Sequence, residues 1–218
     1  KPDFSKAPAL YSFNVPRYFA ILLRAREFAQ HKGIQLSWCY AQDAPMHPDD
    51  RELTAEALEK KRLSWLRRHG QATCSLTSLL ALVVGLPVRL TDNEDRDLHL
   101  YRGRRGFMYE WTEHPETTNI ETSEGEWLLD RLPLVIYIYY PDATWTIGKL
   151  PKGVYPLLLK RRMRPMITFT GLQARRKGFT LVPDFGSTAH MIQSATLDAA
   201  FADFQDASCR VTRAAQRA

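Results

Sequence analysis

Residues 178–205, which read GFTLVPDFGSTAHMIQSATLDAAFADFQ, decide the fold of this chain. The apolar and β-branched residues Phe179–Val182 predict a strand that delivers the small residues 186–188 to a turn. His190 and Gln193 then lie one helical turn apart. Such a turn can offer N–H and hydroxyl donors to a phosphate. Alternatively, these side chains only cap and satisfy the start of a helix.

Before this stretch, helical and strand patterns alternate along the chain. Apolar residues three and four apart between Asn14 and Gly33 predict an amphipathic helix that Asn14 caps and Gly33 ends. Residues 34–40 predict a short strand, and a second helical pattern opens at Asp49. A helix followed by a strand is an α/β element.

The middle of the chain has residue patterns typical of β-strands. We expect the strand around 79–90 to pair with its successor, and we expect the acidic stretch that follows to be polar and turn-rich. The tail from Met191 is expected to be helical or mixed. The predicted strands are 79–90, interrupted at 85–87, then 106–111, 132–140, 167–172 and 179–182.

Charge is divided into two opposed blocks. The chain has 30 Lys and Arg against 24 Asp and Glu, a net charge of +6. Residues 106–130 hold seven acids and no Lys or Arg, whereas 143–183 hold nine basic residues, interleaved with aromatics, and no acid. Cations with aromatic neighbours suit single-stranded nucleic acid. The candidate phosphate contacts are Arg161, Arg162, Arg175 and Arg176, although a basic block is also often only a solvated face.

Several classes of protein are excluded by what the sequence lacks. Three cysteines without Cys-x-x-Cys spacing encode neither a disulfide framework nor a structural zinc site, so a reducing compartment fits best. No apolar run reaches the roughly 18 residues that span a bilayer. No P-loop, dinucleotide-binding motif, nucleophile elbow or metal-binding histidine pair is present. Because the chain begins with Lys1 and has no signal layout, we expect it to be a piece of something longer.

An upstream motif in two parts and one downstream motif stand in an order and at a spacing typical of one protein family. Residues 188–197 read TAHMIQSATL, residues 85–93 read GLPVRLTDN and residues 100–106 read LYRGRRG. They resemble the T-x-H-K-S-Q-G-x-T-L, G-x-x-V-x-L-x-x-N and L-x-N-G-x-x-G segments of the superfamily-1B DNA helicases of the Pif and RecD type. The downstream motif departs from the family's Lys, Ser and Gly at Met191, Ile192 and Ser194.

The resemblance implies an α/β fold. It would be a single, incomplete RecA-like domain of the P-loop type, built on a parallel sheet and carrying an inserted small β-barrel. Residues 1–110 would form the first part of the second RecA-like domain, and 111–176 the inserted barrel with the acidic and then the basic block. Residues 177–218 would return to the RecA-like domain.

The resemblance also implies site residues. Carried over by position, Thr188, His190, Gln193 and Thr196 contact the DNA backbone, and Gln193 also lies at the nucleotide. No catalytic residue and no metal ligand falls in the chain. ATP and Mg²⁺ belong to the full-length protein, and without a P-loop no cofactor or activity is expected of this piece alone.

The expected function is that of a C-terminal fragment of an ATP-dependent DNA helicase. Its partners would be single-stranded DNA or a DNA junction and the remainder of the helicase chain, with no membrane. The setting would be intracellular and nuclear, in DNA repair or recombination. Two alternatives stay open: a degenerate, non-catalytic nucleic-acid-binding module, which the departures at 191, 192 and 194 suggest, and a protein-interaction domain whose charged blocks pair with each other.

Overall fold

The chain is described from a computed structural model that covers residues 9–45, 75–123, 125–161, 166–167, 173–188 and 200–203. The elements in chain order are β1 (Ala9–Tyr11), α1 (Asn14–Lys32), β2 (Leu36–Tyr40), β3 (Gln42–Pro45), β4 (Leu79–Leu82), β5 (Pro87–Leu90), β6 (Arg105–Thr112), β7 (Asn119–Ser123), β8 (Glu126–Leu129), β9 (Val135–Tyr139), β10 (Val154–Leu158), β11 (Lys160–Arg161), β12 (Met166–Ile167), β13 (Gln173–Gly178), β14 (Leu181–Pro183), β15 (Gly186–Thr188) and β16 (Phe201–Asp203).

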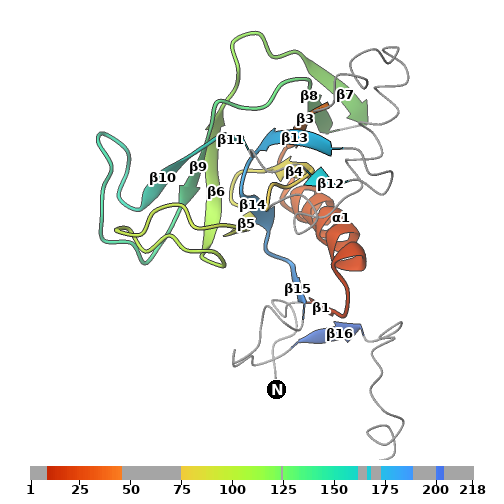
Figure 1. The fold of residues 1–218 in the computed structure, drawn as a ribbon, viewed down its shortest axis with the longest axis horizontal. Helices are drawn as coiled ribbons and strands as arrows, with labels where there is room; N and C mark the ends of the chain where they lie inside the picture. Colours follow the sequence, from red (N-terminus) through yellow and green to blue (C-terminus); the bar gives the residue numbers. More distant parts are fainter. Residues whose placement is uncertain are drawn as a thin grey trace, which may run out of the picture.

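Among the described residues these strands form four sheets, with one helix, α1, beside them (Figure 1). Their orders are β15-β1-β16, β10-β9-β6-β5-β14, β11-β13-β12 with β3 also on β13, and β4-β2-β8-β7. The fold is therefore mixed and rich in sheet. Parallel pairing occurs in β15-β1-β16 and between β2 and β8, while the other described pairings are antiparallel. The two-residue connection between β7 and β8 requires antiparallel neighbours, because a parallel crossover needs a dozen or more residues.

Helix α1 lies where the sequence predicts it. Tyr18, Ile21, Ala25 and Ala29 form its buried face, at the three- and four-residue spacing of an amphipathic helix. The helix ends at Gly33, whose φ of 61° is left-handed and suits glycine. The predicted cap is wrong: the N-cap residue is Phe13, with no side-chain capping bond, and Asn14 is the first helical residue.

The five-stranded sheet confirms the predicted pairing of the strands near 79–90 and 106–111. Strand β5 pairs antiparallel with β6, and β6 pairs with β9, the strand predicted within 132–140. Gly106 is needed in β6 because a Cβ there would lie 2.9 Å from the Ile138 side chain, the Tyr139 carbonyl oxygen and the Tyr140 ring. The glycine that the upstream motif specifies thus allows two strands to approach closely.

The acidic stretch differs from its prediction as a turn-rich segment. It contains β7 and β8, which pair antiparallel with each other. Buried Glu126 receives a hydrogen bond from the Trp38 indole and an ion pair from Arg26, so this acid joins β8 to β2 and α1. Burial acts to raise the pKa of Glu126, but the hydrogen bonds from Arg26 and Trp38 outweigh it and lower that pKa. A charged-residue count could not foresee a strand held by an internal partner.

The interval 111–176, expected as an inserted barrel, shares its strands with the flanking segments. Strand β8 pairs with β2, β9 pairs with β6, and β13 pairs with β3. The sheets that the structure describes include no closed barrel made from this interval alone. Other pairs, β7 with β8 and β9 with β10, lie within the interval, and its assignment as an inserted barrel stays a prediction.

The hydrophobic core lies between these sheets and α1. It draws Leu36 and Trp38 from β2, the apolar residues of β4, and Ile136 and Ile138 from β9. Cys39 is buried in the same core and burial raises its pKa to about 12, which makes its thiol unreactive. In the described part of the chain no helix is long and apolar enough to cross a membrane.

Three predicted elements fall outside the described residues, wholly or in part. The helical pattern that opens at Asp49 lies wholly outside. Of the predicted strand 167–172, only Ile167 is described, within β12. Of the tail from Met191, only residues 200–203 are described, and three of them form β16.

We predict that Gly106→Ala destabilises the chain by about 1–3 kcal/mol, because the new methyl group would overpack against the backbone of β9. Urea unfolding measures this change. Glu110→Ala, an exposed position on the same strand, is the control and should shift the free energy of unfolding by less than about 0.5 kcal/mol. Equal effects of the two substitutions would contradict the close approach of β6 and β9.

Candidate nucleic-acid interface

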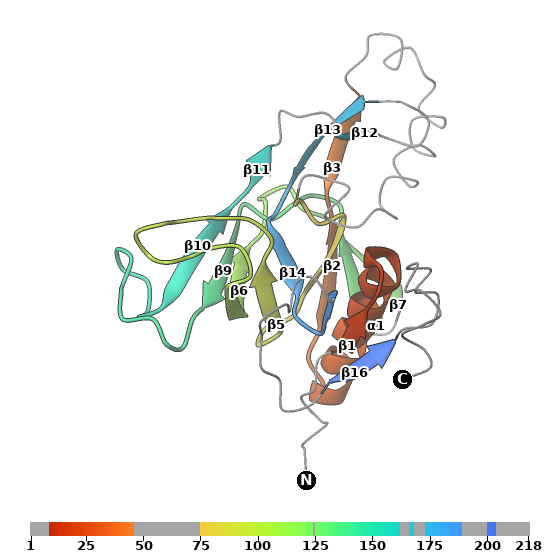
Figure 2. The same ribbon diagram turned by 60° about the horizontal axis from the view of Figure 1, so that its bottom comes forward.

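Residues 186–188, which the sequence predicted at a turn, instead form the parallel strand β15. In β15, Gly186, Ser187 and Thr188 pair in register with Ala9, Leu10 and Tyr11 of β1. Thr188 is buried and is the last described residue of this segment. Ligands of open α/β sheets bind beyond the carboxyl ends of parallel strands. Because β15 and β1 run parallel, Thr188 and the chain leaving β1 lie at the same edge of this sheet. Figure 2 shows β1 beside its other neighbour, β16.

The other motif residues assigned to DNA, His190, Gln193 and Thr196, lie outside the described residues. Their contacts, and the assignment of Gln193 to a nucleotide, stay predictions.

A buried arginine fixes β15 from the side. The Arg89 guanidinium donates from Nη1 to the Ser187 hydroxyl at 2.9 Å and from Nη2 to the Gly186 carbonyl oxygen at 3.0 Å. Asp184 lies 3.3 Å from Arg89 Nε and 2.8 Å from Arg105 Nε. Burial raises the pKa of the Asp184 carboxyl, and this effect outweighs the charges of Arg89 and Arg105, which lower it. Arg89 thus holds the strand that leads into the motif.

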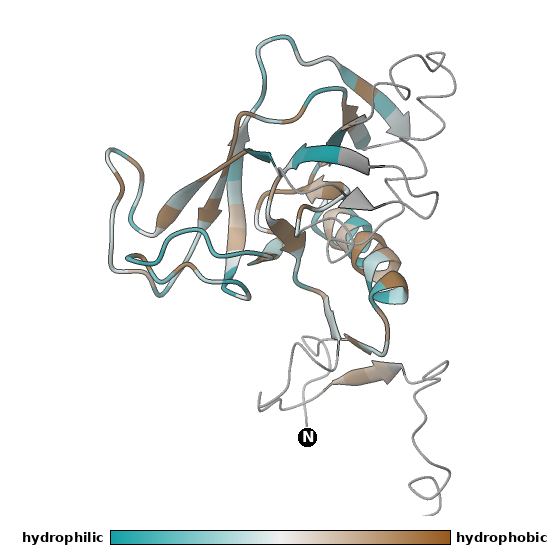
Figure 3. Cartoon of the chain, in the orientation of Figure 1, coloured by the Kyte–Doolittle hydropathy of each residue, from teal (hydrophilic) through white to brown (hydrophobic). Residues whose placement is uncertain are grey.

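Strand β13 carries three consecutive basic residues, which its pleat divides between two faces. Arg175 and Lys177 share one face, and Arg161 of β11 is the register partner of Lys177. Arg161 and Lys177 are exposed and Arg175 is half-buried. We call these three residues the cationic strand face. Figure 3 shows the basic part of β13 coloured as strongly hydrophilic.

The neighbouring strand adds no negative charge to this face. The β3 residues opposite Lys177 and Arg175 are Gln42 and Ala44, and both are exposed. The one acid in β3, Asp43, points to the other side of the sheet. Within the described residues of β3, β11 and β13, no carboxylate shares the face of these cations, which suits a phosphate backbone. Arg162, the remaining predicted contact, lies outside the described residues.

Arg176 faces the interior, and this placement removes it from the candidate interface. Its side chain is 1% exposed and donates to both carboxylate oxygens of Asp43, at 2.7 and 2.6 Å, and to the Ser78 hydroxyl. A buried guanidinium held by a bidentate carboxylate cannot reach DNA. Adjacent arginines in a strand point to opposite faces of the sheet. The sequence does not show how β13 is paired, so it could not predict which of the two arginines is buried.

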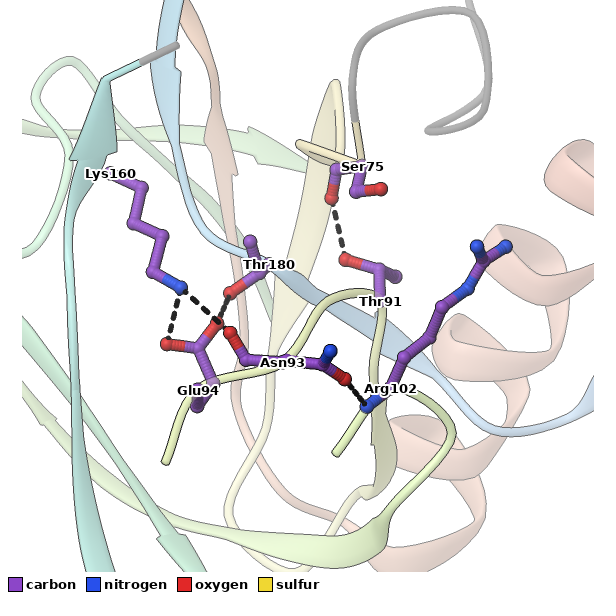
Figure 4. Close-up of polar contacts among 7 residues, drawn as sticks. All are labelled: Ser75, Thr91, Asn93, Glu94, Arg102, Lys160 and Thr180. Carbon is purple, nitrogen blue, oxygen red and sulfur yellow. Dashed lines mark hydrogen bonds and ion pairs between the residues drawn. The ribbon is translucent and has the colours of Figure 1, made fainter. Parts of the chain in front are cut away.

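A second basic residue is occupied by an internal partner (Figure 4). Lys160 Nζ lies 2.8 Å from Glu94 Oε2 and donates to the Asn93 carbonyl oxygen at 3.3 Å. The Thr180 hydroxyl donates to the other Glu94 oxygen. Lys160 therefore fastens β11 to the loop that follows β5.

The upstream motif has a structural role in that loop. The Asn93 side-chain oxygen accepts the backbone N–H of Arg102 at 2.9 Å (Figure 4), and Gly103 turns the chain with a φ of 91°. The Thr91 hydroxyl donates to the Ser75 carbonyl oxygen. These contacts explain the Asn and Gly of the motif through turn formation, without a ligand.

The two charge blocks find partners outside each other. In the acidic block, Glu126 pairs with Arg26 and Glu116 with Arg131. In the basic block, Lys160 pairs with Glu94 and Arg176 with Asp43. These pairs give no support to the alternative in which the blocks neutralise each other. Among the described residues, no group of three or more His, Cys, Asp or Glu side chains could hold a metal ion.

Comparison with known proteins points to one class of fold. No protein-family model matches the chain, and no curated protein matches it. Among solved structures, the Pif1 helicase from Candida albicans matches over 94% of this chain with a TM-score of 0.52 and 13% sequence identity. Bacteroides Pif1 bound to single-stranded DNA matches over 92%, with a TM-score of 0.50 and 11% identity.

A structure that describes DNA unwinding at forked double-stranded DNA by two coordinating Pif1 helicases also matches, with a TM-score of 0.50 and 11% identity. The chain spans 41%, 35% and 33% of the lengths of these Candida, Bacteroides and forked-DNA chains. At such identities the likeness is one of fold. The chain therefore has the fold of part of a Pif1-type helicase.

We predict that Arg176→Ala destabilises the chain by about 3–5 kcal/mol, because it leaves the Asp43 carboxylate buried and unpaired. Lys177→Ala, one residue further along the same strand, should change the free energy of unfolding by less than about 0.5 kcal/mol. Denaturant titration of both variants checks this contrast. A larger loss for Lys177→Ala would mean that the two faces of β13 are exchanged.

Proposed function

We propose that this chain is the single-stranded-DNA-contacting part of a superfamily-1B helicase of the Pif1 type. The observation that carries the proposal is the pairing of that helicase fold with an unopposed cationic strand face of Arg161, Arg175 and Lys177. One solved relative of the fold is bound to single-stranded DNA. The chain would hold the DNA backbone while the rest of a longer protein supplies the chemistry.

The cationic strand face suits a phosphate backbone for electrostatic reasons. Residues two apart in a strand are separated by about 6.6–6.8 Å, and their side chains leave the same face. Arg175, Lys177 and Arg161 therefore present neighbouring cations along and across two strands. Releasing the counterions of the phosphates that they contact provides affinity without reading sequence.

The parallel sheet β15-β1-β16 supports the RecA-like part of the proposal. It puts Thr188 at the carboxyl edge, where the T-x-H segment of the family would leave the sheet. Thr188, His190, Gln193 and Thr196 would then contact the backbone. The strands within 111–176 would correspond to the family's inserted barrel, joined here to the surrounding sheets.

Coupling to ATP belongs to the whole protein. This chain lacks the P-loop that binds nucleotide phosphates, so ATP and Mg²⁺ would be held mainly by residues outside it, with Gln193 as its own contribution. The intracellular, nuclear role in DNA repair or recombination follows only from the resemblance.

A second candidate function is favoured by one specific observation. Met191, Ile192 and Ser194 replace the Lys, Ser and Gly of the helicase motif. Losing a glycine removes the freedom for close backbone approach. A module with these changes would still bind DNA through its cations, but it would not transmit binding to an ATP site.

The test is the salt dependence of binding to a single-stranded oligonucleotide, measured by fluorescence anisotropy. Replacing Arg161, Arg175 and Lys177 together by Gln should weaken binding and flatten the slope of log affinity against log salt by about two, because each phosphate contact contributes about 0.7. Thermal unfolding of the same variant checks that it is folded.

A matched control removes three exposed cations from other surfaces. Replacing Arg96, Lys149 and Lys152 by Gln gives the same change in net charge, and the slope should stay near that of the unaltered chain. Equal flattening in both variants would mean that net charge alone drives binding. An unchanged slope in the first variant would favour a protein-interaction domain.

A further inference from the structure

A second group of cations lies apart from the cationic strand face, where β14 leads into β15 against the start of α1. It comprises Arg17, Arg89 and Arg105, with Asp184 as their described carboxylate partner. Arg89 and Arg105 both pair with this one carboxylate. Among the described residues the three guanidinium groups face this one carboxylate, a net charge of +2, with Arg17 and Arg89 buried and Arg105 59% exposed at the rim.

Arg17 is the member of the group for which the described residues supply no hydrogen-bond acceptor to Nε or Nη1. Its side chain is buried, with the residue only 6% exposed, and neither Nε nor Nη1 has a hydrogen-bond partner in the described structure. Arg89 Nε also lacks a hydrogen bond, although Asp184 lies 3.3 Å away. Buried donors without acceptors are costly, and more so when they are charged. Native proteins usually satisfy such groups with a ligand, water or ion.

The charge of Arg17 persists at neutral pH. Burial, followed by the charge of Arg89, lowers the pKa of Arg17 to about 10, and Asp184 acts in the opposite direction. A guanidinium with that pKa is still protonated at pH 7. Deprotonation therefore does not remove the excess charge at pH 7, and a bound anion would compensate it.

The position of Arg17 favours an anion. It belongs to the first turn of the 19-residue α1, which has no acidic residue in that turn and no side-chain cap at Phe13. Long helical side chains lean toward the N-terminus of their helix, and that end carries partial positive charge. The same end follows the carboxyl edge of β1, beside Thr188.

We propose that Arg17 and Arg89, with the first turn of α1, form a binding site for a phosphate dianion. A free phosphate or the terminal phosphate of a nucleotide carries about two negative charges, which matches the excess, whereas a backbone phosphodiester carries one. A phosphodiester is also flanked by sugar on both sides and does not fit around a guanidinium that is 6% exposed. The site is distinct from the cationic strand face.

Thermal unfolding of the 218-residue chain in phosphate, compared with chloride at matched ionic strength, tests the site. Phosphate at a hundredfold excess over its Kd should raise Tm by about 5–10 °C. Arg17→Met, a substitution of similar length without charge, should abolish this shift while being as stable as the unaltered chain in chloride. Arg17→Lys keeps the charge and should retain a weaker shift.

Arg96→Gln is the matched control, an exposed arginine whose loss should leave the phosphate shift unchanged. Two results would overturn the proposal. One is an equal phosphate shift in Arg17→Met and the unaltered chain. The other is a marked loss of stability of Arg17→Met in chloride, because Arg17 would then be satisfied by internal contacts.

The source of the phosphate is distinguished by comparing inorganic phosphate with ADP, using adenosine as the blank. A half-maximal concentration at least tenfold lower for ADP assigns the site to a nucleotide, and equal values assign it to free phosphate. A shift that depends on Arg17 and is produced by an oligonucleotide without a terminal phosphate would overturn the assignment to a dianion.

The triple variant of the cationic strand face should keep the phosphate response. Failure of DNA binding and failure of this phosphate site are therefore separable.

Discussion

The ion pair between Arg176 and Asp43 decides which surface the basic part of the chain presents. It is buried on both sides, bidentate, and joins β13 to β3 across 133 residues of sequence. Taking two charges out of water is costly unless the geometry is good and further hydrogen bonds are made. Ser78 supplies one of these. Because Arg176 is held inward, the pleat turns Arg175 and Lys177 toward the other face.

Other charged side chains are also paired inside the molecule. Lys160 pairs with Glu94, and Glu126 binds Arg26 and Trp38. Part of the charge in the acidic and basic blocks is therefore neutralised by contacts within the fold. Arg17 differs, because its guanidinium is buried near Arg89 and Asp184 while Asp184 is already paired with Arg89 and Arg105. A buried charge that has a partner helps to hold the fold together, whereas a buried charge without a partner suggests a bound ligand.

The upstream motif and the T-x-H segment differ in what the structure shows of their residues. Asn93, Gly103 and Gly106 belong to the segment that resembles the helicase family, and here each has a local structural reason: a side-chain acceptor for a turn, a left-handed φ and a close strand contact. Their spacing therefore reports a fold. The T-x-H segment differs, because Thr188 ends a parallel strand at an edge where α/β proteins bind ligands.

Local patterns were sufficient for α1, for the strands near 79–90, 106–111 and 132–140, and for the first sheet pairing, because periodicity and turn residues act over a few positions. The helix cap, the strands within the acidic stretch and the burial of Arg176 were not predictable, because each depends on a partner distant in sequence. The sequence by itself determined the kinds of element, the helicase-like motifs and the excess of positive charge. Only the tertiary structure decided which cations face solvent, since strand register and long-range ion pairs choose the face of every side chain.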